Sequence, residues 1–333
     1  MTDSPPHRAG SDDSAQLLAV EGLTVTFPTT RGPVDVVRDN TFALRQGETL
    51  GIVGESGSGK SMTALAVMGL LPRTARTSGS IRFQGTELLG RPDAELRRLR
   101  GNMMSMVFQD PLSSLNPYYT VGLQIAEVYR CHRGGSRRAA RRVAVEALGR
   151  VGIPDPAERV DRYPHQFSGG QRQRIVIAMA LICEPALLIA DEPTTALDVT
   201  VQSQILDLLA ELKRQTGTGM LFITHDLAVI ASIAQRVLVM RDGRQLEYAD
   251  TERVFSAPRH PYTRMLLESI PRIDDEPAAP GIPYGPDGPD GPDGPDGPDG
   301  PDGPDGRTAP APARPAPARP APARPAAAQE DAR

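Results

Sequence analysis

Residues 49–61 read Thr-Leu-Gly-Ile-Val-Gly-Glu-Ser-Gly-Ser-Gly-Lys-Ser, and this stretch decides the fold of the chain. Its first five residues are typical of a buried strand, and its last eight fit the pattern G-x-x-x-x-G-K-[ST]. A helical pattern follows from Lys60 to about Leu71. Because a strand, a glycine-rich turn and a helix in this order make up a P-loop, the sequence predicts a nucleotide site here.

The predicted phosphate loop consists of Gly54, Glu55, Ser56, Gly57, Ser58, Gly59, Lys60 and Ser61. Its glycines allow backbone N–H groups to turn towards phosphate oxygens, and the helix N-terminus adds a field that favours an anion. We expect Lys60 to reach the β- and γ-phosphates of ATP and Ser61 to bind Mg²⁺.

Two adjacent carboxylates, Asp191 and Glu192, end the apolar run that begins at Leu187. Such a position places both at the carboxyl edge of a parallel sheet, where nucleotides bind. We expect Asp191 to hold the Mg²⁺ shell and Glu192 to accept a proton from the attacking water.

Further strand patterns lie from Leu18 onward, at Ala186–Ala190 and at Met220–Thr224, with helical patterns between them. Buried strands that alternate with helices are typical of an α/β domain. The fold class that we predict is a P-loop NTPase core with a largely parallel sheet, an antiparallel β edge and an inserted helical subdomain at about residues 110–172.

The predicted domain organisation is a flexible N-terminal tail at 1–16, a nucleotide-binding domain at 17–271 and a disordered tail at 272–333. Gly-Pro-Asp triplets repeat from Gly285 to Asp305, and alanine, proline and arginine recur after them. Such a composition cannot bury a core. So few triplets favour an acidic, semi-extended linker over a collagen triple helix.

The composition argues against several classes of protein. The formal net charge of −4, with no basic stripe, disfavours nucleic acid as a partner. The chain shows no apolar run long enough to span a membrane and no secretory signal at its start. Cys131 and Cys183 are expected to stay reduced, with neither a bridge nor a metal.

The segment Phe167-Ser168-Gly169-Gly170-Gln171, which introduces a helix, resembles the signature of ABC ATPases. The order of phosphate loop, Gln109, signature, Asp191-Glu192 and His225 is similar to the order in that family. The resemblance covers about Leu17 to Pro271 and implies that the chain is an ABC-type ATPase.

The resemblance also implies a role for each matching residue. Ser168, Gly169, Gly170 and Gln171 would close on ATP bound by a second ATPase subunit, in a homo- or heterodimer. Gln109 would contact Mg²⁺ and the water, His225 would contact the γ-phosphate, and Asp198 would couple the two sites. Phe27 matches the position at which family members stack an aromatic ring on adenine.

Residues 108–117, 163–167 and 259–263 resemble the oligopeptide, dipeptide and nickel importer branch of that family. This implies a motor on the cytoplasmic face of the membrane that works with two permease subunits and an extracytoplasmic substrate-binding protein to import di- and oligopeptides. Members of the branch commonly carry a cysteine cluster for an iron-sulfur centre. Because no cysteine follows Cys183, we predict no such cluster.

Three alternatives stay open at this point. The same motor could import nickel or another small solute, since the subunit itself does not touch the cargo. A soluble ABC ATPase acting on DNA ends or ribosomes would need a long coiled coil or, usually, two cassettes, and the sequence offers neither. A scaffold that binds ATP without turnover would lack Glu192 or His225, and both are present.

Overall fold

The computed structural model describes residues 16–110, 114–195 and 197–269. The strands of the described part are β1 (Gln16–Thr29), β2 (Gly32–Arg45), β3 (Thr49–Val53), β4 (Arg76–Phe83), β5 (Thr86–Glu87), β6 (Met104–Val107), β7 (Leu187–Asp191), β8 (Gly219–Thr224), β9 (Arg236–Arg241) and β10 (Arg244–Asp250). Its α-helices are α1 (Lys60–Val67), α2 (Asp93–Leu99), α4 (Val121–Arg133), α5 (Arg137–Arg150), α6 (Pro156–Arg159), α7 (Gly169–Leu181), α8 (Val199–Thr216), α9 (Leu227–Ile233), α10 (Thr251–Ser256) and α11 (Pro261–Glu268). A 3₁₀ helix, η2 (Pro164–Gln166), precedes α7.

These strands form one ten-stranded sheet within the described residues, in the order β5-β4-β1-β2-β10-β9-β3-β8-β7-β6. The run from β9 through β3, β8 and β7 to β6 is parallel. The strands β1, β2, β4 and β5 pair antiparallel with one another, and β10 pairs antiparallel with β9. This arrangement confirms the predicted P-loop core with a parallel sheet and an antiparallel edge.

The parallel part of the sheet is buried on both faces. In β7, Leu188 and Ala190 belong to one hydrophobic cluster, whereas Leu187 and Ile189 belong to the other. Alternate side chains of a strand point to opposite faces, so both faces need a cover of apolar residues. This double burial explains why the strand reads as a continuous apolar run in the sequence.

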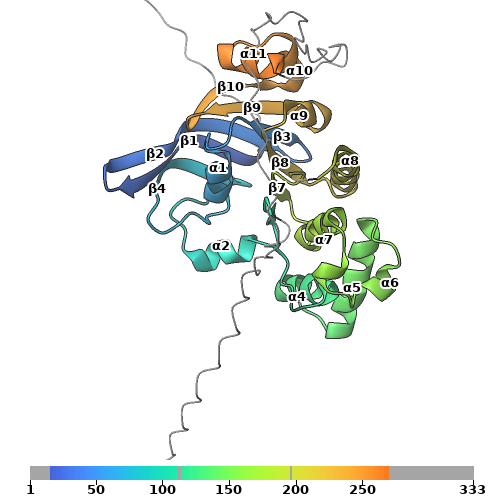
Figure 1. The fold of residues 1–333 in the computed structure, drawn as a ribbon. Helices are drawn as coiled ribbons and strands as arrows, with labels where there is room; N and C mark the ends of the chain where they lie inside the picture. The colour runs from blue at the N-terminus through green and yellow to red at the C-terminus, as the bar shows by residue number, and fades with distance from the viewer. Residues whose placement is uncertain (1–15, 111–113, 196, 270–333) are drawn as a thin grey trace, which may run out of the picture. The chain divides into compact units, whose positions relative to one another are not determined.

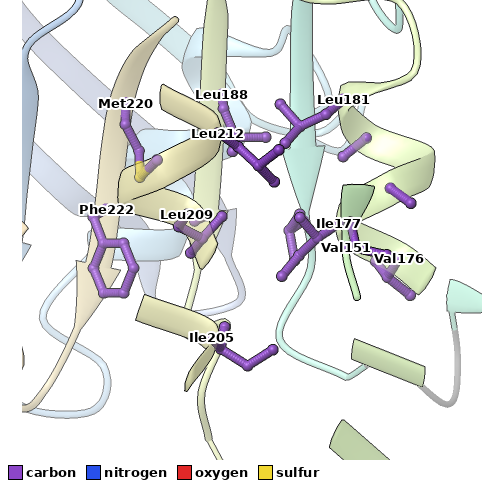
Figure 2. Packing of buried hydrophobic residues seen from close by; sticks show 14 of the residues in the cluster. Val151, Val176, Ile177, Leu181, Leu188, Ile205, Leu209, Leu212, Met220 and Phe222 are labelled. Atoms are coloured by element: carbon purple, nitrogen blue, oxygen red, sulfur yellow. The ribbon is translucent and has the colours of Figure 1, made fainter. Parts of the chain in front are cut away.

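Helix α8 shows how one of these faces is covered. Its buried residues Ile205, Leu209 and Leu212 recur at the three- and four-residue spacing of one helix face. Figure 2 shows them packed with side chains of α7 and of the strands β7 and β8, namely Ile177, Leu181, Leu188, Met220 and Phe222. This packing fixes the carboxyl end of β7, where Asp191 ends the strand and Glu192 follows it.

The helices α4, α5 and α6 gather beside α7 (Figure 1). Ser136 caps α5 by accepting a hydrogen bond from the backbone N–H of Ala139, which stabilises the start of the helix. The helical segment expected at about residues 110–172 contains α4, α5, α6 and η2. The segment leads into α7, which carries the signature at its N-terminus.

Helix α1 is shorter than the sequence pattern indicates, because it ends at Val67 instead of continuing to about Leu71. Gly69 has a φ of 61° and donates its N–H to the carbonyl of Ala66, while Leu70 donates to the carbonyl of Leu65. This pair of hydrogen bonds is a Schellman motif, which closes a helix at a left-handed glycine. The apolar residues beyond Val67 therefore do not extend the helix.

Most of the tails predicted at 1–16 and 272–333 lies outside the described residues; Gln16 is the first residue of β1. None of the described helices is both long and apolar enough to cross a membrane.

Candidate nucleotide site

The phosphate loop, residues 54–61, connects the buried strand β3 to α1. Gly57 and Gly59 have φ values of 80° and 98°, a region in which residues with a side chain are strained. A Cβ atom at Gly59 would lie 2.6 Å from the carbonyl oxygen of Val36. Both glycines are therefore required by the backbone of the loop.

The loop has the properties of an anion site. The hydroxyl of Ser58 is buried and has no hydrogen-bond partner among the described residues. Because an unpaired buried hydroxyl is costly, its presence in the loop indicates a place for a bound acceptor. The N-terminus of α1 opens on the same loop and favours negative charge. The residues thus fit the phosphates of ATP.

Lys60 is 5% exposed and lies inside the loop. Its Nζ donates to the carbonyl oxygens of Gly54 at 2.7 Å and of Glu55 at 2.9 Å. Burial lowers the pKa of Lys60, and the nearby carboxylates of Glu192, Asp191 and Glu55 oppose that shift. The ammonium group is therefore held at the loop by its carbonyls and by negative charge.

Asp191 and Ser61 form the second part of the site. The Ser61 hydroxyl donates to Oδ1 of Asp191 at 3.1 Å, and Asp191 is 6% exposed. Burial raises the pKa of Asp191, as does the charge of Glu192, whereas the Ser61 hydrogen bond and Lys60 lower it. Mg²⁺ in nucleotide sites takes one or two protein oxygens together with phosphate oxygens, so this hydroxyl–carboxylate pair fits the ion.

Glu192 lies at the centre of a polar cluster. Its Oε2 accepts hydrogen bonds from Nε2 of Gln109 at 3.1 Å and from the hydroxyl of Thr195 at 2.9 Å. Nδ1 of His225 lies 3.5 Å from its Oε1. Three segments far apart in the sequence thus meet at one carboxylate.

The backbone of Glu192 is itself unusual, because its φ of 48° lies in the left-handed region. For a residue other than glycine this conformation is uncommon and strained, and such residues gather at functional sites. The backbone N–H of Glu192 donates to the carbonyl of Ile223 at 2.9 Å, which ties the turn after β7 to β8. The sheet therefore holds the strained turn in place.

The signature residues form the N-cap and the first turn of α7. Ser168 is the N-cap, and its side chain and that of Gln171 form a reciprocal capping box. Ser168 and Gly169 are exposed, and a Cβ atom at Gly170 would lie 2.6 Å from Cγ1 of Val201 in α8. Within the described residues, no hydrogen bond joins this segment to the phosphate loop of the same chain.

The two remaining predicted residues lie apart from the Glu192 cluster. Phe27 in β1 is partly buried against the hydrophobic cluster that contains Phe42 and Phe83. Asp198 is exposed and caps α8 by accepting the N–H of Val201 at 2.9 Å. The described contacts leave adenine stacking by Phe27 and coupling through Asp198 as predictions.

Sequence reasoning missed two residues of the site. Thr195 donates to Glu192, and only its place three residues after that carboxylate signals a shared turn. Tyr262 of α11 accepts a hydrogen bond from the backbone N–H of Glu55 in the phosphate loop. No local pattern connects these two, because 207 positions separate them.

Comparisons with known families agree with this geometry. Residues 37–195 match the family described as ABC transporter. Residues 246–290 match the family described as oligopeptide/dipeptide transporter, C-terminal region.

Comparisons with individual proteins point the same way. The chain is 55% identical to the oligopeptide transport ATP-binding protein OppD of Salmonella typhimurium, over 79% of this chain and 78% of the relative. It is 52% identical to the dipeptide transport ATP-binding protein DppD of Bacillus subtilis, over 78% of each chain.

Solved structures extend the similarity to the fold. The dimeric ATP-binding cassette MJ0796 in a post-hydrolysis state with ADP and Pi has a TM-score of 0.63 and 27% identity, covering 70% of this chain and 98% of that one. CbiO1 from Clostridium perfringens, part of the ABC transporter complex cbiONQ, has a TM-score of 0.62 and 28% identity, covering 73% and 92%.

Proposed function

Because this chain belongs to the ABC transporter family as an ATP-binding and ATP-hydrolysing subunit, we propose that it powers the uptake of di- and oligopeptides through separate membrane permease chains. The observation that carries the mechanism is the convergence of Gln109, Thr195 and His225 on Glu192 beside the Asp191–Ser61 pair. Peptide cargo is supported by the identity to OppD and DppD and by the second family match at residues 246–290.

The phosphate loop binds the triphosphate of ATP. Its backbone N–H groups and the N-terminus of α1 surround the β- and γ-phosphates. Lys60 exchanges the carbonyls of Gly54 and Glu55 for phosphate oxygens, which also relieves the cost of its burial. The Ser58 hydroxyl gains the partner that it lacks among the described residues.

Ser61 and Asp191 would hold Mg²⁺, and Gln109, which donates a hydrogen bond to Glu192, would be a further contact of the ion. When bound, the ion neutralises charge on the β- and γ-phosphates as the terminal phosphate leaves. Burial, together with the adjacent charge of Glu192, raises the pKa of Asp191, so a divalent cation is the natural counter-charge.

Glu192 positions the attacking water and accepts its proton. The hydroxyl of Thr195 and the amide of Gln109 fix the orientation of the carboxylate. The side chain of His225 is 61% exposed, so it is accessible from solvent and would contact the γ-phosphate. Because phosphoryl transfer depends mainly on positioning and charge, this fixed carboxylate is the group whose loss should cost most turnover.

The complete site needs a second ATPase subunit. Ser168, Gly169, Gly170 and Gln171 are presented at the N-terminus of α7, where they would cover the γ-phosphate held by the phosphate loop of the other subunit. Asp198, at the start of α8, would couple the two sites, and Phe27 would stack on adenine. The similarity to a dimeric cassette with ADP and Pi supports this assembly.

The assembly that we propose works at the cytoplasmic face of the membrane. It comprises two ATPase subunits, identical or different, two permease subunits and an extracytoplasmic substrate-binding protein. The similarity to transport ATP-binding proteins of peptide systems supports these partners.

Uptake of labelled dipeptides and oligopeptides by the source cell tests the cargo. Wild-type cells are compared with cells that carry Glu192→Gln, and uptake of labelled nickel is measured in parallel. We expect peptide uptake to be lost in the variant while nickel uptake is unchanged. Unchanged peptide uptake would reject the peptide assignment, and a selective loss of nickel uptake would replace it.

A further inference from the structure

Tyr262 of α11, the last described helix, forms a hydrogen bond with the phosphate loop. Tyr262 is 3% exposed, and its hydroxyl accepts a hydrogen bond from the backbone N–H of Glu55 at 3.3 Å. Figure 1 shows α11 beside α10 and β10, in the last described part of the chain. The second residue of the phosphate loop is therefore held by an element that follows the whole sheet in sequence.

Glu55 is the residue through which this contact reaches the rest of the loop. Its carbonyl oxygen accepts hydrogen bonds from Nζ of Lys60 at 2.9 Å and from the backbone N–H of Ser58 at 3.2 Å. A shift of Glu55 would move the carbonyl oxygen that accepts both of these hydrogen bonds. Tyr262 is thus linked to Lys60 and to the turn of the phosphate loop through the backbone of Glu55.

The side chain of Tyr262 is fixed by its own surroundings. Buried Glu247 accepts the backbone N–H groups of Arg259 at 2.9 Å and His260 at 3.2 Å, which anchors the start of α11 to β10. His260 then caps the helix by accepting the N–H of Tyr262 at 3.1 Å. The guanidinium of Arg241 lies 4.8 Å from the centre of the tyrosine ring.

The phosphate loop is supported at a second point. The backbone N–H of Gly243, in the turn between β9 and β10, donates to the carbonyl of Ser58 at 3.1 Å. Tyr262 lies within residues 246–290, which match the oligopeptide/dipeptide transporter C-terminal region, whereas Gly243 precedes that region. The helix therefore adds a support to the loop that the sheet alone does not supply.

We propose that Tyr262 is a positioning residue for ATP binding, whose hydroxyl holds Glu55 so that the phosphate loop is pre-organised for the triphosphate. The inference rests on the proposed function of this loop as the ATP site. If the loop must become ordered when ATP binds, the free-energy cost of that ordering weakens the net affinity for ATP. Because the loop grips the phosphates in the ground state and in the transition state alike, losing the support should raise KM and leave kcat unchanged.

Tyr262→Phe in the purified full-length chain tests the proposal, because it removes the hydroxyl and keeps the ring over Arg241. Net contributions of single hydrogen bonds predict a rise in KM and in the Kd for ATP of about two- to tenfold. The kcat should change by less than about twofold. Titration with a fluorescent ATP analogue gives the Kd, and steady-state hydrolysis gives KM and kcat.

Tyr248→Phe is the matched control. The hydroxyl of Tyr248 also bonds to backbone, donating to the carbonyl of Ala43 at 2.9 Å and accepting its N–H at 3.2 Å. It accepts a further hydrogen bond from Arg236, but within the described residues no hydrogen bond joins it to the phosphate loop. This variant should lose thermal stability without a change in KM. It separates a general loss of stability from a specific loss of ATP affinity.

Unchanged Kd and KM in Tyr262→Phe would overturn the proposal. Equal rises in KM in the two tyrosine variants would also overturn it, because the effect would then follow stability. If the wild-type chain, assembled with its partner ATPase subunit, binds ATP without hydrolysing it, the proposed function fails, but the ratio of the Kd values still tests Tyr262.

Discussion

Replacing the carboxylate of Glu192 by an amide should remove most of the turnover and little of the stability. In the Glu192→Gln variant, an amide oxygen in the place of Oε2 can still accept the hydrogen bonds of Gln109 and Thr195. The amide nitrogen then takes the place of Oε1, 3.5 Å from Nδ1 of His225. The cluster keeps its shape but loses the group that accepts the proton.

The size of the effect follows from these contacts. General base catalysis contributes about 10²- to 10⁴-fold to a rate. At about 1.36 kcal/mol for each factor of ten, the activation free energy should rise by about 2.7–5.4 kcal/mol. Both hydrogen bonds survive, so the stability change should stay within about 1 kcal/mol, or about 2–4 °C in Tm for a chain of this size.

The assay compares kcat, ATP affinity and Tm of the wild type, Glu192→Gln and Glu184→Gln. Glu184 is a matched control, since its φ is 49°, against 48° for Glu192, and its exposed carboxylate pairs only with Arg150 among the described ion pairs. We expect Glu184→Gln to hydrolyse ATP at the wild-type rate. A kcat within tenfold of wild type in Glu192→Gln, with ATP still bound, would refute the role of Glu192 as the base.

Two further variants test the neighbouring groups. Burial raises the pKa of Asp191, so its charged form destabilises the folded chain at a pH above the folded-state pKa. Asp191→Asn should therefore raise the Tm of the nucleotide-free chain at neutral pH. The same variant should abolish Mg²⁺-dependent turnover. The gain in Tm should decrease as the pH falls through the folded-state pKa of Asp191, because the carboxyl group is then neutral. Differential scanning calorimetry at several pH values measures this, and a gain that persists at low pH would contradict the prediction. Gly170→Ala places a Cβ atom 2.6 Å from Val201 and should cost about 1–3 kcal/mol of stability, while adding Val201→Ala should recover part of the lost Tm. Equal melting temperatures of the single and double variants would contradict this steric account.

The phosphate loop is the part of the site that sequence predicts best. The spacing of Gly54, Gly59 and Lys60 follows from local needs, namely backbone conformations open to glycine and a cation at the start of a helix. The loop forms as expected. The end of α1 was predicted less well, because a glycine at position 69 closes the helix through backbone hydrogen bonds that apolar periodicity does not register.

The cluster around Glu192 could be predicted only in part. Sequence order and family resemblance nominate Gln109 and His225. The sequence alone, however, does not indicate how far these side chains lie from Glu192. The parallel pairing of β6, β7 and β8 brings their carboxyl ends to one edge, and that pairing makes the contacts possible. Thr195 joins the cluster because the strained backbone at Glu192 turns the chain back towards its carboxylate.

The sequence by itself determined the P-loop class and the membership in a family of transport ATPases, and it nominated the residues that we propose bind phosphate. These features depend on residue types at fixed short spacing. Such short patterns determine the local backbone conformation directly. Only the tertiary structure decided which residues meet at Glu192 and that Tyr262 supports the phosphate loop. Such contacts join positions up to 207 residues apart, and they arise from strand order and helix packing, which a local pattern does not encode.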